Sequence, residues 1–96
     1  MILHKVSTSP YADSALSHCL KLLTADDGLL LLQDGVYALT HHAYQPELAN
    51  LSHLYLLADD ITARGIDSDI TLANATQIDF DQFVALSLKF NQVMSW

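Results

Sequence analysis

The 96-residue sequence contains one cysteine, three glycines and four Lys or Arg residues, and each scarcity excludes a class of site. A single cysteine, Cys19, cannot form an internal disulfide or a cysteine-built zinc site. Three glycines cannot supply a glycine-rich loop that cradles phosphates, so a nucleotide-binding module ranks last among the functions considered. Four cations stand against eleven carboxylates, and the formal charge of −7 argues against a surface that binds tRNA or duplex DNA.

Long hydrophobic runs are also missing. No stretch approaches the ~18 uninterrupted apolar residues of a transmembrane helix, so no membrane partner is expected. Residues 1–6 are followed at once by polar residues 7–10, which is unlike a secretory signal peptide. Yet 51% of the residues are apolar and 16% are charged, which excludes intrinsic disorder. We therefore expect an acidic cytoplasmic protein that forms one domain over residues 1–96.

The high apolar content predicts a surface that binds partners. A domain of this size buries about 60–70% of the surface that its unfolded chain exposes. The apolar residues that the core does not accommodate are expected in exposed patches, which usually mark interfaces. The alternative is an ordinary monomer with an unusually apolar surface.

Apolar runs and helical periodicity alternate along the chain. Strands are expected at residues 2–6, 29–32, 54–58 and 76–80, with an edge strand or docked tail at 93–96. Helices are expected from Pro10 to Leu23 with Gly28 as the stop, at 36–39, at 46–51, from a cap at Asp59 to Gly65, and at 81–90. The pattern predicts an α/β fold, a small three-layer α/β/α domain with a mainly parallel sheet of four to five strands.

Polar residues at the carboxyl ends of the strands are the first place to look for function. These are residues 7–10, 34–35 and 59–60. Paired carboxylates at 26–27 and 59–60 are more typical of turns and helix starts than of acid–base sites. No convincing catalytic constellation emerges from these residues.

The five histidines do not form a metal-binding pattern. They are His4, His18, His41, His42 and His53. No two of them fall four residues apart in one predicted helix, so no metal site and no cofactor are expected. The pair His41-His42 is interpreted as a solvated loop. His4 and His53 are expected to be neighbours if their strands pair.

Cys19 is the residue whose chemistry matters most. A thiolate is nucleophilic and can carry persulfide sulfur, but this requires exposure and a lowered pKa. Cys19 lies in the later half of its predicted helix, on the apolar stripe, where the helix dipole gives little help. The residues alone favour a buried, inert cysteine over a reactive one.

Several segments, taken in order, resemble the TusB/DsrH family. They are Leu3-His4, Ser9-Pro10, the run LLLLQDGV at 29–36, ARGI at 63–66, IDFDQFV at 78–84 and Trp96. The set covers nearly the whole chain, and it is closer to the TusB branch than to the DsrH branch. The resemblance implies a DsrE-like fold, in agreement with the alternation of strands and helices.

The resemblance also implies a place in a sulfur relay. TusB-type proteins form a heterohexamer with TusC- and TusD-like subunits, two copies of each, between TusA- and TusE-like sulfur carriers. The sulfur ends in 2-thiouridine at the wobble position of tRNA. DsrH-type members are the equivalent subunits of DsrEFH complexes in sulfur oxidation. In both, the principal sulfur-carrying cysteine lies on another subunit.

These implications predict an accessory, non-catalytic subunit of a sulfurtransferase complex that contacts proteins rather than nucleic acid. Cys19 matches the place where DsrH-type members carry a cysteine, so it is the candidate catalytic residue, as a sulfur acceptor. A DsrH-type subunit with Cys19 as a persulfide-accepting thiol is therefore the alternative. In isolation, self-association into a homo-oligomer is a further expectation.

Overall fold

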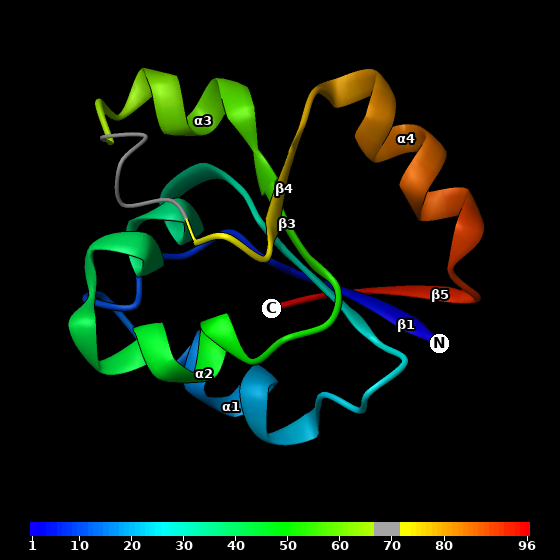
Figure 1. Cartoon of the computed structure of the whole chain (residues 1–96), viewed down its shortest axis with the longest axis horizontal. Helices are drawn as coiled ribbons and strands as arrows, with labels where there is room; N and C mark the ends of the chain where they lie inside the picture. The colour runs from blue at the N-terminus through cyan, green and yellow to red at the C-terminus, as the bar shows by residue number, and fades with distance from the viewer. Residues whose placement is uncertain (67–71) are drawn as a thin grey trace.

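The computed structural model describes residues 1–66 and 72–96, which are arranged around a five-stranded sheet (Figure 1). Its strands are β1 (Ile2–Val6), β2 (Gly28–Leu31), β3 (Leu54–Leu57), β4 (Ala75–Ile78) and β5 (Gln92–Ser95). Their order is β4-β3-β2-β1-β5, and all four neighbouring pairs are parallel. The predicted α/β fold class is therefore confirmed, with five strands.

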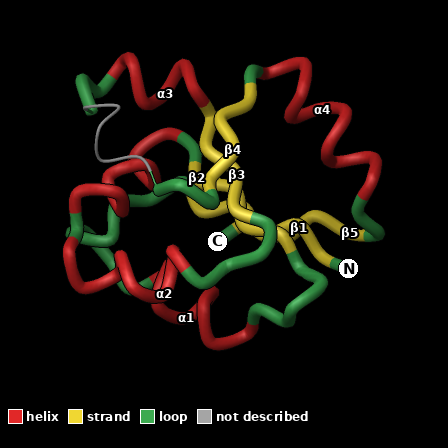
Figure 2. Tube along the Cα trace, viewed as in Figure 1, coloured by secondary structure: helices red, strands yellow, loops and turns green. Residues whose placement is uncertain are grey.

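Helices lie on both faces of this sheet (Figure 2). They are α1 (Ala15–Leu22), the 3₁₀ helices η1 (Gln33–Thr40) and η2 (His42–Tyr44), α2 (Gln45–Ala49), α3 (Ala58–Ala63) and α4 (Phe80–Lys89). Buried residues of α1, η1, α2 and α3 share one core cluster. Leu86 of α4 belongs to a separate cluster with Leu3 and Leu30. We call the two sides the covered face and the α4 face.

The direction of the connections explains this division. From β1 to β4 the chain steps across the sheet in one direction, and the step from β4 to β5 reverses it. Parallel crossovers are right-handed almost without exception, so a reversal of direction places the connecting helix on the opposite face. This rule accounts for α4 standing apart from α1 and α2 in Figure 1.

The leucine run forms the centre of the sheet, as the sequence predicts. All four residues of β2 are buried. Leu29 and Leu31 point to the covered face and Leu30 to the α4 face, because side chains alternate along a strand. A strand in this position has no polar face, which is why its sequence shows no alternation.

Both boundaries predicted for the first helix differ from those of the structure. Helix α1 begins at Ala15 and not near Pro10, because the Asp13 carboxylate accepts hydrogen bonds from the Ala15 N–H and the Thr8 hydroxyl and holds residues 9–13 in turns. Gly28 does not stop a helix but opens β2. A Cβ at this position would lie 2.7 Å from the Phe90 ring, so the close approach of that ring requires glycine.

The start and end of α3 and the start of α4 can also be compared with the sequence predictions. Asp59 is not a cap as predicted, because α3 begins at Ala58 and Leu57 occupies the cap position. Gly65 has a φ of 63°, the left-handed conformation predicted for the end of this helix. Helix α4 starts with a capping box in which Asp79 and Gln82 exchange side-chain hydrogen bonds with each other's backbone N–H, a signal that the sequence analysis missed.

Within residues 1–66 and 72–96, no helix has the length and hydropathy that crossing a membrane requires.

Candidate functional site

Cys19 lies on the inner side of α1 beside Leu16, and its residue is 0% exposed. Burial, with a smaller contribution from the negative charge of Asp27, raises the pKa of the thiol from 9.0 to about 12. The thiol is therefore protonated at neutral pH, whereas the thiolate is the nucleophile in sulfur transfer. In this conformation Cys19 is a small apolar core residue.

The neighbouring Asp27 is held by an array of donors. Its Oδ1 accepts from the Ile2 N–H at 2.9 Å, and its Oδ2 lies 3.2 Å from both the Thr24 N and the His4 Nε2. Burial alone would raise the pKa of Asp27, but these hydrogen bonds outweigh it and lower the pKa from 3.8 to about 2. The ionised carboxylate of Asp27 thus joins the start of β1 to the loop before β2.

His4 extends this array to the end of the chain. The Trp96 indole N–H donates to His4 Nδ1 at 3.0 Å, so that nitrogen must be an unprotonated acceptor. His4 Nε2 then carries the hydrogen and donates to Asp27. The arrangement assigns the neutral Nε2–H tautomer to His4 and leaves neither of its ring nitrogens free to act on a ligand.

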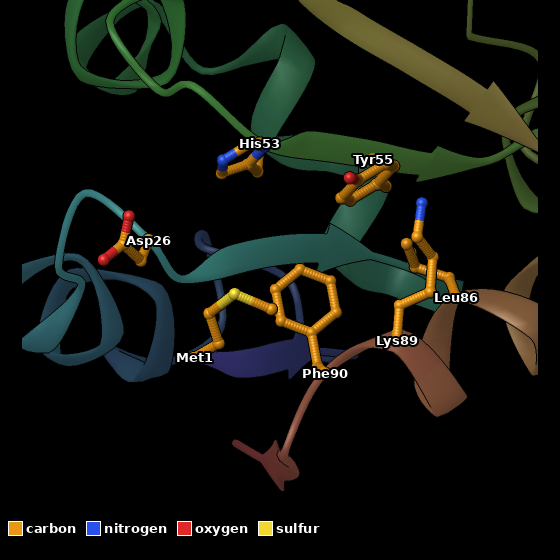
Figure 3. A pocket seen from close by; sticks show the side chains of 7 residues that line it. All are labelled: Met1, Asp26, His53, Tyr55, Leu86, Lys89 and Phe90. Atoms are coloured by element: carbon orange, nitrogen blue, oxygen red, sulfur yellow. The ribbon is translucent and has the colours of Figure 1, made fainter.

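Two cavities open at the amino ends of the strands. One has a volume of about 170 Å³ and lies between β3 and the end of α4 (Figure 3). Figure 3 shows Met1 and Phe90 on one side of it and His53 and Tyr55 on the other. The second, of about 240 Å³, lies beside the end of α1, and Cys19 is not among its lining residues. Both are smaller than typical small-molecule sites of ~300–1,000 Å³.

At the opposite end of the sheet, the predicted polar residues form an ion-pair group. Arg64 Nε donates to Asp34 Oδ1 at 2.9 Å, and its Nη1 lies 3.5 Å from Asp60 Oδ1. Asp60 Oδ2 also accepts from the Gln33 N–H at 2.6 Å. The carboxylates that the sequence placed at these strand ends are thus brought together, but they bind Arg64 and join η1 to α3.

The histidines occupy positions that differ from two predictions. His41 is not simply solvated, since its ring stacks on Tyr11 at 4.8 Å and meets the edge of Tyr44 at 4.9 Å. His4 and His53 are not strand neighbours, because β2 lies between β1 and β3. In the described parts of the chain, no three His, Cys, Asp or Glu residues gather as metal ligands.

Large apolar side chains are exposed at several places on the surface. Three of them, Phe80, Val84 and Leu88, lie on α4, and two more, Val93 and Met94, lie on β5. Exposed apolar surface is what the composition predicted; single residues such as Tyr11 and Leu22 contribute to it elsewhere, and the residues of α4 and β5 contribute several together. The geometry therefore offers surface for protein contacts, while the thiol of Cys19 is closed to solvent.

The contacts of His4 with Asp27 and Trp96 could not be predicted from the sequence. These residues lie up to 92 positions apart, and nothing in their local patterns announces a shared hydrogen-bond network. The capping box of Asp79 and Gln82, although the sequence analysis missed it, has a spacing that the sequence alone shows.

Comparisons with known proteins agree with this structure. A family model described as "DsrH like protein" matches residues 8–93. The proteins named "Protein TusB" of Yersinia pestis (strain Pestoides F) and Yersinia pseudotuberculosis serotype O:1b (strain IP 31758) are each 41% identical over 97 residues, which covers 99% of this chain and all of each relative.

The fold is similar to that of the YchN protein of E. coli. The TM-score is 0.80 over 99% of this chain and 97% of that chain, at 16% sequence identity. An identity this low shows the DsrE-like fold alone. Together with the family match along most of the sequence, the comparisons establish that the chain belongs to the TusB/DsrH family.

Proposed function

We propose that this chain is an accessory subunit of a TusBCD-type sulfur-transfer complex in the cytoplasm, which relays persulfide sulfur toward 2-thiouridine at the tRNA wobble position. The observation that carries the proposal is the burial of Cys19. It is the one cysteine of the chain, and its thiol is protonated at neutral pH and closed to solvent. A relay that works by persulfide exchange then needs the thiolate of another subunit.

The role of this chain in that relay is positional. Its partners are TusC- and TusD-like subunits in a heterohexamer, and it meets TusA- and TusE-like carriers indirectly. The exposed apolar residues of α4 and β5 supply surface for assembly. The charge of −7 fits a subunit that contacts proteins while the tRNA is handled elsewhere.

The alternative is a DsrH-type subunit in which Cys19 accepts persulfide sulfur. For this, the inner face of α1 must open, because the sulfur is fully buried and does not line either cavity. The raised pKa of Cys19 opposes the reaction in the closed conformation as well. The first proposal needs no such opening, and for that reason we prefer it.

Co-expression with TusC- and TusD-like proteins tests the proposal. We expect the chain to co-purify with both and native mass spectrometry to show two copies of each subunit. Cys19→Ala should assemble equally well and should support the same level of wobble-uridine thiolation as the unchanged chain. Failure to bind either partner would refute the proposal.

A second experiment decides between the two roles of Cys19. The assembled complex is treated with a persulfide donor, and each subunit is weighed by mass spectrometry. We expect no sulfur adduct on Cys19 in the native complex, and rapid labelling of Cys19 after unfolding in urea. An adduct at Cys19 under native conditions, lost in Cys19→Ala together with thiolation, would establish the alternative.

A further inference from the structure

The residue that follows β5 attaches that strand to the core. Strand β5 lies at the edge of the sheet, where it pairs with β1, and its four residues are all exposed. Trp96 differs from them, because it is partly buried and packs against the core of the covered face. Its backbone N–H donates to the Lys5 carbonyl at 2.9 Å. Trp96 therefore anchors a strand whose own side chains add little burial.

The contact of the Trp96 indole depends on the protonation of His4. The indole N–H donates to His4 Nδ1 at 3.0 Å, and the centroids of the two rings are 6.0 Å apart. An imidazole nitrogen accepts a hydrogen bond only while it carries no hydrogen. A proton on Nδ1 would set one N–H against another in a site where His4 is 2% exposed. The bond to Trp96 therefore requires the neutral ring.

The other nitrogen of His4 has the opposite preference. Its Nε2 lies 3.2 Å from Asp27 Oδ2 and donates to it in the neutral ring. In a charged ring the same contact becomes an ion pair, which is the stronger bond. The pKa of Asp27 is about 2, so Asp27 stays ionised over the range from about pH 5 to pH 8 in which histidines ordinarily titrate. Protonation of His4 would thus strengthen one side of the network and break the other.

The elements packed around His4 leave Asp27 as the main charge that faces it. On this side of the sheet β2 contributes Leu29 and Leu31, and β5 contributes Met94, which pairs with His4. Helix α1 contributes Cys19, whose thiol is neutral because burial raises its pKa to about 12. Where the chain ends at Trp96, the terminal carboxylate adds a second negative charge. The remaining titratable side chains of these elements are exposed or point to the α4 face, and they are Lys5, His18, Lys21 and Asp26.

We propose that His4 is a proton-operated latch that holds Trp96 and, through it, β5. The neutral ring binds the indole and keeps β5 on β1. When His4 takes up a proton from solvent at Nδ1, it keeps Asp27, the indole N–H loses its acceptor, and Trp96 leaves the core. Each release takes up one proton, so the ratio of released to bound latch rises by up to about tenfold for each unit by which the pH falls.

Fluorescence of the purified full chain tests the proposal, because Trp96 is its one tryptophan. The emission maximum and the quenching constant for acrylamide are measured between pH 8 and pH 5. We expect a single transition toward longer wavelength and stronger quenching as the pH falls, since the released indole enters water. An emission maximum and a quenching constant that stay the same over this range would overturn the proposal.

Two histidine variants identify the group that takes up the proton. His4→Gln offers an amide oxygen to the indole and an amide N–H₂ to Asp27, and it does not titrate. We expect this variant to show no transition. His53→Gln is the matched control, since His53 is exposed outside the network, and it should keep the transition of the unchanged chain. A transition that persists in His4→Gln would overturn the assignment to His4.

Hydrogen exchange followed by mass spectrometry shows what the latch releases, and it keeps the test available if His4→Gln does not fold. After correction for the intrinsic effect of pH, the amides of residues 92–96 should lose protection at pH 5 in the unchanged chain, while those of β2 keep it. Trp96→Phe removes the indole N–H, so residues 92–96 should have low protection at both pH 8 and pH 5. Joint loss of protection in β2 and β5, with loss of the circular dichroism of the fold, would show acid unfolding and overturn a local latch.

Discussion

The two faces of the sheet are built from similar residues but reach very different degrees of burial. The core of the covered face joins four helical segments to the sheet around residues such as Leu31 and Leu56, both 0% exposed. The α4 face has one helix, and its core is limited to Leu3, Leu30, Ile78 and Leu86. Topology makes this difference, because three crossovers run in one direction and one runs back.

The comparison teaches where the apolar surplus of a small domain is placed. The covered face uses its leucines to stabilise the fold, while the α4 face leaves apolar side chains available to another molecule. Substitutions of the same kind should therefore have large effects on stability on one face and small effects on the other. Four predictions test this division, from the largest effect to the smallest.

The largest effect is expected at Leu31. Leu31→Ala removes a fully buried side chain from the centre of the covered face, and it should lower the free energy of unfolding by about 2–5 kcal/mol. Urea unfolding followed by circular dichroism measures the change. A loss below about 1 kcal/mol would mean that this core is loosely packed.

Asp27→Asn should have the next largest effect, a loss of about 2 kcal/mol at neutral pH. The amide cannot accept all the hydrogen bonds from Ile2, Thr24 and His4, and its own N–H₂ would face a donor. The folded-state pKa of Asp27, about 2, lies below its ordinary value of 3.8. Its stabilisation is therefore complete above that ordinary value and is lost as the pH falls toward 2.

Urea unfolding of Asp27→Asn and the unchanged chain between pH 6 and pH 2 measures this difference. The gap in stability between the two proteins should narrow as the pH falls below about 4. A gap that stays constant over this range would show that the charge of Asp27 does not contribute.

Trp96→Phe is expected to cost about 1 kcal/mol. It removes the indole N–H that donates to His4 Nδ1 and leaves that buried nitrogen without its partner. His4→Ala should remove most of the additional effect of Trp96→Phe, so a double-mutant cycle measures the coupling. Additive effects of the two substitutions would contradict a direct interaction.

The smallest effect is expected at Leu88. Leu88→Ser should change the free energy of unfolding by no more than about 0.5 kcal/mol at concentrations where the chain is monomeric, since the side chain is largely exposed. The same measurement on Leu86→Ser, on the buried side of α4, provides the contrast and should show a loss of about 2 kcal/mol or more. Equal losses at the two positions would remove the distinction between the sides of α4.

Much of the fold was predictable, and the errors share a physical cause. The strand in the leucine run, the alternation of strands with helices and the helix near residues 81–90 were predicted from local sequence patterns, and the structure contains all three. The start of α1 and the role of Gly28 were missed because they depend on Asp13 bonding Thr8 and on the Phe90 ring lying against β2. Those contacts join segments that the sequence does not show to be neighbours.

In the candidate site, too, local features were predicted and contacts between distant segments were not. The helical spacing around Cys19 correctly placed it on the buried side of α1. The spacing did not reveal that Asp27 lies near the thiol and raises its pKa further, because that depends on how the loop before β2 packs under α1. The network of His4 and Trp96 also required the tertiary structure, since β5 reaches β1 through a crossover over the whole sheet.

The sequence by itself determined that this chain forms a parallel α/β sheet, that it has no excess of positive charge for nucleic acid, and that it has more apolar residues than a small core can bury. Periodicity, charge and composition are local or additive properties, so they are present in the unfolded chain. Only the tertiary structure decided that much of the surplus lies on α4 and β5, and that His4, Asp27 and Trp96 meet. Both results follow from the order of the strands, in which the last crossover reverses direction and carries α4 alone to the opposite face.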